Sequence, residues 1–412
     1  MTLRVTTRPL EDDRPLLELI PPGDAVAFVR ADEGLVGWGE ALRLRPGPGP
    51  DRIERADQAL REVEAEIDDP VGLPGSGLVA IGSFSFASDS ADSALVVPRV
   101  VVGRREGRTF LTRIDPVTTP PAPPAPDPAT SRPAAVTRDR PRYAGSTVPD
   151  VRWLEAVAEA VRRIDAGDLD KVVLARDHAL WARDVFDPLE LARRLTDRFP
   201  SCHTFVIDGL VGATPELLLS RRGRRVASRV LAGTAARDPD EASDAALGAA
   251  LLESDKDRWE HRLAAESVEQ VLAPHCRELT HEPHPRLLRL DNVQHLATTF
   301  DGELAADDSA LELVAALHPT AAVGGTPREQ ALELIAELEG MDRGRYAGPV
   351  GWTDQHGDGE WGIALRCAEL AGARARLFAG VGVVSASLPE DELEETRLKL
   401  LAMQAVLDAD PT

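Results

Sequence analysis

Lysine and tyrosine are scarce in this chain of 412 residues. Lysine and arginine together number 47, but lysine occurs only as Lys171, Lys256 and Lys399, so 47 − 3 = 44 of these residues are arginine. Arginine replaces lysine where only positive charge is needed, but not where a side chain must release a proton near neutral pH. The three retained lysines are therefore either leftover surface residues or candidates for chemistry.

Cysteine and long apolar runs are also lacking, and both absences exclude classes of protein. The cysteines, Cys202, Cys276 and Cys367, are far apart and include no CxxC pair, so neither a disulfide framework nor a thiolate zinc site is expected. No apolar run approaches the length of a membrane span, and the first residues lack the apolar segment of a signal peptide. We therefore expect a cytoplasmic protein.

Positive charge is in the minority, with 69 acidic residues against 47 basic ones and a net charge of −22. This balance excludes non-specific nucleic-acid binding, which needs a basic surface, and disfavours docking on anionic membranes. A small anionic substrate still fits, provided that its site is locally positive.

The order of apolar and turn-forming residues predicts an α+β fold in three parts. Residues 1–115 resemble short strands and turns, and residues 116–147 contain a proline-rich stretch that is either a linker or a surface excursion. Residues 148–412 combine hairpins with long helical segments, of which one is expected at 241–273 and another at 389–407. Because strands join mostly through turns while helices come in separate blocks, we expect antiparallel sheets.

Two of the predicted helices each carry a pair of acidic residues three positions apart. The pairs are Asp257 with Glu260, and Glu392 with Glu395. Residues at this spacing share one helix face. One such pair is usually a solvated surface, but four carboxylates would converge if the two helices faced each other, and hard oxygen ligands of this kind suit magnesium. The spacing alone leaves both interpretations open.

Glycine-rich turns and one strand arginine are further candidates. The turns at 321–327 (AAVGGTP) and 378–387 (FAGVGVVSAS) precede helices, so they either bind an anion through backbone N–H groups or are simply capped turns. Arg366 has apolar neighbours and needs a partner, which is either a carboxylate ligand or an internal salt bridge. His295 and His318 lie in less polar surroundings and suit the core.

Together these motifs resemble the chorismate-utilising enzymes, a family that includes isochorismate synthase, salicylate synthase, anthranilate synthase component I and aminodeoxychorismate synthase component I. The matching runs follow the family's order: KVVLAR (171–176), GATPELLL (212–219), LAGT (231–234), SDKDRWEH (254–261), VQHL (293–296), LHPTAAVGG (317–325), YAGPVGW (346–352), IALRCAEL (363–370), FAGVGVV (378–384) and SLPEDELEETRLK (387–399). Residues 1–147 match only loosely. The resemblance implies one large catalytic domain with two pseudo-equivalent halves, whose antiparallel sheets are packed between helices.

The resemblance also implies a magnesium site and a substrate-binding wall. Glu260 and Glu395 would bind Mg²⁺, assisted through water by Asp257 and Glu392, and the ion would hold the ring carboxylate of chorismate. The residues implied to contact the substrate are His295, Ala322, Tyr346, Arg366, Gly380, Lys399, Leu231 and Thr234.

The family divides by its nucleophile, and two positions of this chain match the members that use water. Members that use ammonia generally carry glutamine at the position of Lys171, and aminodeoxychorismate synthases have a lysine in a PIKGT motif where this chain has Ala232. The resemblance implies that Lys171 removes a proton from water, which attacks C2, while Glu216 protonates the departing C4 hydroxyl to give isochorismate. Lys256 is expected to be structural and paired within its own helix.

Three alternatives remain beside isochorismate synthase. Salicylate synthase also eliminates pyruvate; the small Ala322 and Val323 argue against it, whereas Tyr346 leans toward it. A non-catalytic chorismate-binding protein would be expected to lose Lys171 or Glu216. Anthranilate or aminodeoxychorismate synthase would need an amidotransferase subunit, and we expect instead a monomer without that partner, whose product feeds menaquinone or siderophore biosynthesis.

Overall fold

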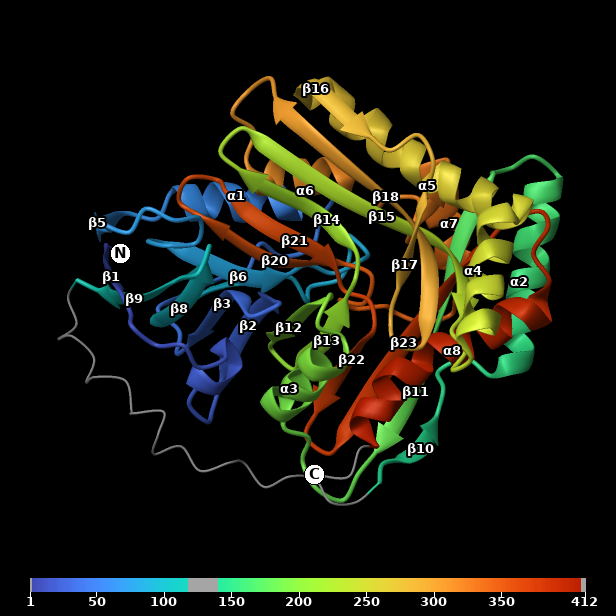
Figure 1. Cartoon of the computed structure of the whole chain (residues 1–412), viewed down its shortest axis with the longest axis horizontal. Coiled ribbons are helices and arrows are strands. Elements are labelled where there is room, and N and C mark those ends of the chain that lie inside the picture. The colour runs from blue at the N-terminus through green and yellow to red at the C-terminus, as the bar shows by residue number, and fades with distance from the viewer. Residues whose placement is uncertain (1, 118–139, 409–412) are drawn as a thin grey trace.

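Two large sheets and the helices around them make up the computed structural model, which describes residues 2–117 and 140–408 (Figure 1). Within these residues, sheet A has 13 strands and sheet B has 10. The α-helices are α1 (Arg52–Arg61), α2 (Asp150–Asp165), α3 (Pro188–Arg198), α4 (Glu241–Glu253), α5 (Asp255–Leu272), α6 (Ala310–Leu317), α7 (Arg328–Leu338) and α8 (Pro389–Leu407). Two 3-10 helices are η1 (Leu16–Leu19) and η3 (Ala273–His275). The predicted α+β class is confirmed.

The strands of both sheets come from distant parts of the chain. Sheet A runs in the order β10 (Arg142–Gly145), β11 (Lys171–Trp181), β23 (Arg374–Val383), β22 (Cys367–Ala371), β13 (Leu210–Thr214), β12 (His203–Ile207), β2 (Ala25–Arg30), β3 (Glu33–Trp38), β8 (Val100–Arg105), β9 (Arg108–Pro116), β1 (Leu3–Pro9) and β5 (Ala65–Asp68), with β19 (Gly325–Thr326) beside β11. Sheet B runs in the order β16 (Cys276–His281), β18 (Val293–Leu304), β15 (Arg225–Ala236), β14 (Leu217–Arg222), β21 (Gly359–Ile363), β20 (Pro349–Asp354), β6 (Val79–Ser83), β7 (Ala94–Val97) and β4 (Leu42–Leu44), with β17 (Arg286–Arg289) beside β18.

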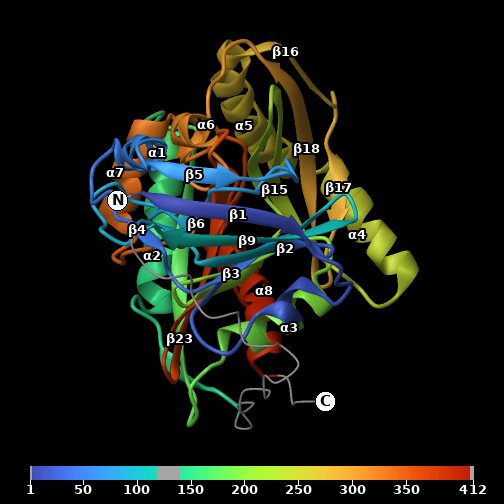
Figure 2. The ribbon, with the colours of Figure 1, turned by 90° about the vertical axis from the view of Figure 1, so that its left-hand side faces the viewer.

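The N-terminal strands complete both sheets. β2 pairs with β12 in sheet A, and β6 pairs with β20 in sheet B, both antiparallel. Figure 2, which looks at the N-terminal end, shows β1, β5 and β9 side by side at the front of the molecule. Among the described pairs only β1 with β5 is parallel. Residues before 117 are thus built into the same two sheets as the later strands.

The core follows the two-residue period of the strands. In β2, Val26 and Phe28 point into the main cluster, which also contains buried residues of sheet B and of helices α1, α2, α5, α6 and α7. Ala27 and Val29 point the other way, into a second cluster under α3 and the C-terminal half of α8. This alternation is what a strand buried on both faces requires.

The single helix expected at 241–273 is wrong, because the chain breaks it at Ser254. Ser254 has extended dihedral angles (φ −66°, ψ 115°), ends α4 and caps α5, and its side chain accepts a hydrogen bond from the backbone N–H of Asp257. Serine is a favoured N-cap because its oxygen satisfies an otherwise unpaired N–H group at the helix start. The break places Asp257 in the first turn of α5.

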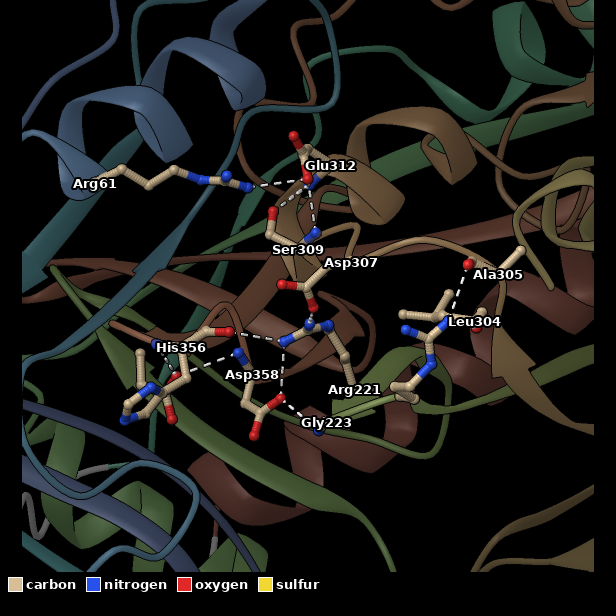
Figure 3. Close-up of polar contacts among 12 residues, drawn as sticks. Arg61, Arg221, Gly223, Leu304, Ala305, Asp307, Ser309, Glu312, His356 and Asp358 are labelled. Carbon is tan, nitrogen blue, oxygen red and sulfur yellow. Dashed lines mark hydrogen bonds and ion pairs between the residues drawn. The ribbon is translucent and has the colours of Figure 1, made fainter. Parts of the chain in front are cut away.

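A buried arginine fixes the turn between β20 and β21 to the start of α6 (Figure 3). Arg221 donates to the carbonyl oxygen of His356 at 2.9 Å and to Asp358 at 2.9 Å, and forms an ion pair with Asp307 at 2.6 Å. Beside it, Ser309 and Glu312 form a capping box at the start of α6. A guanidinium can satisfy several acceptors at once because its donors form a rigid fork.

Two further expectations concern membranes and the proline-rich stretch. Of the helices in the described residues, none combines the length and the apolarity that crossing a membrane requires. The stretch predicted at 116–147 lies largely outside the described residues, but Arg142–Gly145 forms β10 and pairs with β11.

Candidate active site

A cavity between the two sheets gathers most of the residues singled out from the sequence. Its walls come from β11, β15, β18 and β23, from the turn between β13 and β14, and from helices α5 and α8. The predicted residues that line it are Glu216, Leu231, Thr234, Glu260, His295, Ala322, Tyr346, Arg366, Gly380 and Lys399. The other four do not line it. Lys171 and Asp257 interact with Glu260, and Glu395 pairs with Lys399, whereas Glu392 pairs with Lys256, which lies outside the lining.

A wider open groove, of about 1570 Å³, contains none of the predicted residues. It is lined by five arginines, among them Arg43 and Arg376, and by five acidic residues, among them Asp177 and Asp208. Arg43 pairs with Asp208 and Arg376 with Asp177, so much of its charge is already compensated. The smaller cavity between the sheets is therefore the candidate site.

Lys171 is the first residue of β11 and is fully buried, with 0% of its surface exposed. Its Nζ atom lies 3.2 Å from Oε1 of Glu260, and it makes no well-oriented hydrogen bond with the described residues. The neighbouring strand β23 comes close because Gly382, opposite Val173, has no side chain: a Cβ atom there would lie 2.9 Å from Cε of Lys171. The amine is thus held behind the cavity wall with donors to spare.

Glu216 lies in the turn between β13 and β14 and is also buried. Burial raises the pKa of Glu216 to about 8, although the charges of Lys171, Arg229, Lys399 and Arg366 work against this rise. Removal from water disfavours the ionised carboxylate, so the carboxyl group holds its proton at neutral pH. The site therefore offers a proton donor beside a buried amine.

Arg366 and His295 form a hydrogen-bonded pair on one wall of the cavity. Nη2 of Arg366 donates to Nε2 of His295 at 2.8 Å, and Nδ1 of His295 lies 3.2 Å from the carbonyl oxygen of Gly233 and from Oγ1 of Thr234. Burial lowers the pKa of His295 well below its ordinary value, and the charges of Arg366 and Lys399 lower it further. A neutral imidazole accepts through one nitrogen and donates through the other, which matches this arrangement.

Arg366, at this wall, has a hydrogen-bond donor that no described residue uses. Among the described residues Arg366 forms no ion pair, and its buried Nη1 atom has no hydrogen-bond partner. Lys399 donates to the carbonyl oxygen of Gly380 at 2.9 Å and pairs with Glu395 at 2.5 Å. Tyr346 stacks on Phe378 with ring centroids 5.0 Å apart. Of the two partners expected for Arg366, an internal salt bridge does not form in the described residues, and an anionic ligand would supply the missing acceptor.

The four predicted metal ligands come from the two helices predicted to carry them. Burial raises the pKa of Asp257, and the nearby charges of Glu260 and Glu395 raise it further. Burial and the charge of Glu395 raise the pKa of Glu392 to about 7, whereas Lys399 lowers the pKa of Glu395 against the effect of burial. The carboxylates of α5 and α8 therefore repel one another across a short distance.

The predicted ligands suit a magnesium ion that is held by two carboxylates and by water. In the described part of the chain, no three His, Cys, Asp or Glu side chains are grouped closely enough to hold a metal ion by themselves. Magnesium usually keeps several waters and takes one or two protein carboxylates together with substrate oxygens. The mutual repulsion of buried acids around Glu260 and Glu395 suits a divalent cation, so the residues fit the predicted ion.

Sequence reasoning missed three features of this site. Lys256 does not pair within its own helix: its Nζ lies 2.5 Å from Oε1 of Glu392 on α8. Gly382 lines the cavity beside Gly380, and their spacing of two on one strand was the available signal. Arg343 also lines it, and bonds to the carbonyl oxygens of Val173 and Val323. No local pattern could reveal those two distant acceptors.

Comparison with known proteins agrees with this site. The family model described as "Chorismate binding enzyme" matches residues 26–408. Isochorismate synthase DhbC of Bacillus subtilis is 42% identical over 270 residues, which cover 63% of this chain and 68% of that protein. Isochorismate synthase EntC of Escherichia coli K12 is 42% identical over 254 residues, covering 60% and 65%.

Solved structures share the fold over nearly the whole chain. The menaquinone-specific isochorismate synthase MenF of Escherichia coli superimposes with a TM-score of 0.82 at 26% identity, covering 98% of this chain and 94% of that one. Anthranilate synthase component I of Streptococcus pneumoniae TIGR4 shares the fold at 20% identity, with a TM-score of 0.73 and 93% of each chain covered. With the family model matching most of its length, this chain belongs to the chorismate-binding enzymes.

Proposed function

We propose that this protein is an isochorismate synthase, which isomerises chorismate to isochorismate in the cavity between the sheets. The observation that carries the proposal is the pairing of a fully buried amine, Lys171, with a carboxyl group whose pKa is raised to about 8, Glu216. Glu216 lines the cavity and Lys171 lies behind its wall, and a base and an acid of this kind are what proton transfer at neutral pH requires. The relatives named isochorismate synthase support the same reaction.

The substrate is a dianion, and the positive charge for it is local to the cavity. Arg366 has a free buried donor, and Lys399 and the Tyr346 hydroxyl lie along the same wall, so these groups would hold the side-chain carboxylate. Glu260 and Glu395 would hold Mg²⁺, which when bound would supply positive charge for the ring carboxylate near His295. An acidic protein can thus bind an anion because Arg366 and Lys399 concentrate positive charge at one wall of the cavity.

The chemistry at the ring needs two proton movements. Lys171 as the neutral amine takes a proton from water, and the oxygen of that water forms a bond with C2 of the ring. The double bonds shift, the C4–O bond breaks, and Glu216 gives its proton to the departing hydroxyl, which leaves as water. Lys171 is fully buried, and no described residue accepts a well-oriented hydrogen bond from its amine. Arginine could not replace it, because a guanidinium stays protonated.

Salicylate synthase is the second candidate, because it would use the same pocket and then eliminate pyruvate. Ala322 lines the cavity next to Val323, and neither side chain has a polar group that could act on the isochorismate formed there. This favours release of isochorismate. The ammonia-using synthases are disfavoured, since those members generally carry glutamine at the position of Lys171.

The test is to incubate the purified protein with chorismate and magnesium and to separate the products by chromatography. Isochorismate alone supports the proposal, and salicylate with pyruvate supports the second candidate. EDTA should abolish turnover and excess Mg²⁺ should restore it. Anthranilate or aminodeoxychorismate that appears only with ammonia, or no turnover at all, would overturn the proposed function.

A further inference from the structure

An arginine outside the cavity grips the turn that carries Glu216. Arg229 lies on β15 directly opposite Leu217, the residue after Glu216. Its Nε and Nη2 atoms both donate to the carbonyl oxygen of Pro215, at 3.1 and 2.6 Å. Proline has no N–H, so this carbonyl is the only backbone hydrogen-bonding group that Pro215 offers.

The other backbone hydrogen bonds of the turn are made by Glu216 itself. The N–H of Glu216 donates to Oγ1 of Thr214 at 3.2 Å, and the carbonyl of Glu216 accepts from the N–H of Ile363 at 3.3 Å. Arg229 holds the preceding residue, Pro215, with two hydrogen bonds to its carbonyl oxygen. Without Arg229 the Pro215 carbonyl would have no partner among the described residues, and the peptide between Pro215 and Glu216 would be held only through the N–H of Glu216.

The charge of Arg229 also acts on the carboxyl group of Glu216. Burial raises the pKa of Glu216, and four positive charges lower it. They belong to Lys171 on β11, Arg229 on β15, Lys399 on α8 and Arg366 before β22. Lys399 and Arg366 line the cavity, where a dianionic substrate would compensate their charge, and Lys171 pairs with Glu260. Arg229 does not line the cavity and forms no ion pair with the described residues, so its charge persists when the substrate binds.

We propose that Arg229 is a positioning residue for the proton donor: it fixes the turn that directs Glu216 into the cavity and keeps a positive charge acting on that carboxyl group while substrate is bound. This inference rests on the proposed function. Burial alone would hold the proton too tightly, and a donor works best when its pKa is close to the working pH. The uncompensated guanidinium moderates that effect from outside the cavity.

The test compares Arg229→Gln, which removes the charge but keeps an amide donor, with Arg229→Lys, which keeps the charge but loses the two-bonded grip. The measurement is the pH profile of kcat/KM for chorismate at saturating Mg²⁺. In the wild type we expect activity to fall as pH rises through about 8, where Glu216 loses its proton. In Arg229→Gln this limb should move up by about one pH unit, and in Arg229→Lys it should stay in place while kcat falls about tenfold.

A second readout does not need turnover. In protein labelled with ¹³C at the glutamate side-chain carboxyl, the Glu216 signal is identified by its loss in Glu216→Gln and titrated without substrate. The Arg229→Gln signal should titrate at higher pH than the wild-type signal. If neither the ¹³C signal nor the kinetic limb moves in Arg229→Gln, the inference is overturned. If Arg229→Gln does not fold, a wild-type kcat in Arg229→Lys would overturn it. A shifted signal in a protein that makes no isochorismate would instead refute the proposed function alone.

Discussion

Replacing Gly382 by alanine should lower activity while leaving stability nearly unchanged. In Gly382→Ala the new Cβ would overlap Oε1 of Glu260 and lie 2.9 Å from Cε of Lys171. Both are ends of side chains, and Gly382 has no left-handed dihedral angle, so alanine fits the strand backbone. We expect the free energy of unfolding to change by less than about 1 kcal/mol, because the side chains can yield while the strand stays in place.

The catalytic cost follows from how far these groups must move. Glu260 and the amine of Lys171 would each have to shift by about 1 Å, and a misplacement of this size typically lowers the rate about 100-fold. That factor corresponds to about 2.7 kcal/mol of transition-state stabilisation. The assay is steady-state isochorismate formation with chorismate and Mg²⁺, paired with thermal unfolding followed by circular dichroism.

Gly351 in β20 provides the matched control. A Cβ there would overlap the carbonyl oxygen of Glu360 and lie 2.8 Å from Cα of Trp361, which are backbone atoms of the paired strand β21. Gly351→Ala should therefore lower the unfolding temperature by several degrees, because the strand pair must separate. If Gly382→Ala keeps wild-type kcat/KM, or if it unfolds like Gly351→Ala, the placement of Lys171 and Glu260 derived above is wrong.

Three more outcomes follow from the charges of the site. Lys171→Arg should lose about 10²–10⁴-fold in kcat because a guanidinium cannot act as the base, and wild-type turnover by this variant would exclude the role. The pKa of Glu216 is raised to about 8 in the folded protein, so between pH 4.5 and about 8 the folded state keeps a proton that the unfolded state has lost. The free energy of unfolding should therefore fall as the pH rises through this range, by at most about 1.4 kcal/mol per pH unit. Urea unfolding of Glu216→Gln should lack this slope. Lys256→Met should destabilise the protein by about 2 kcal/mol, less than a fully buried pair would cost, because the side chain is 28% exposed and the pKa of Glu392, about 7, lets that carboxyl take up a proton. Adding Glu392→Gln should recover most of this loss in urea unfolding, and no recovery would show that the Lys256–Glu392 pair is not its cause.

The sequence could predict what depends on local spacing. The helical intervals of Asp257 and Glu260, and of Glu392 and Glu395, placed each pair on one helix face. Period-two and turn patterns predicted antiparallel sheets, which the structure confirms. The motif resemblance named ten residues that line the cavity, although their catalytic and binding roles stay predictions.

What depends on tertiary contacts could not be predicted. Ser254 reads as one more residue of a long helical stretch until its cap geometry is known. The partner of Lys256 lies 136 residues further along the chain, and the hydrogen bonds of Arg229 reach 14 residues back, across the bulge between β14 and β15. Such contacts are fixed only when the sheets assemble, so no window of neighbouring residues contains them.

The way the first 116 residues are woven into both sheets limits how this protein can be shortened. Removing them would strip β2 from β12 and β6 from β20, leaving one unpaired strand edge in each sheet. Bare edges of this kind recruit strands from other molecules. An expression fragment that starts after residue 140 should therefore aggregate, and inhibitor screening or crystallisation will require the N-terminal segment even though it contributes no side chain to the candidate site.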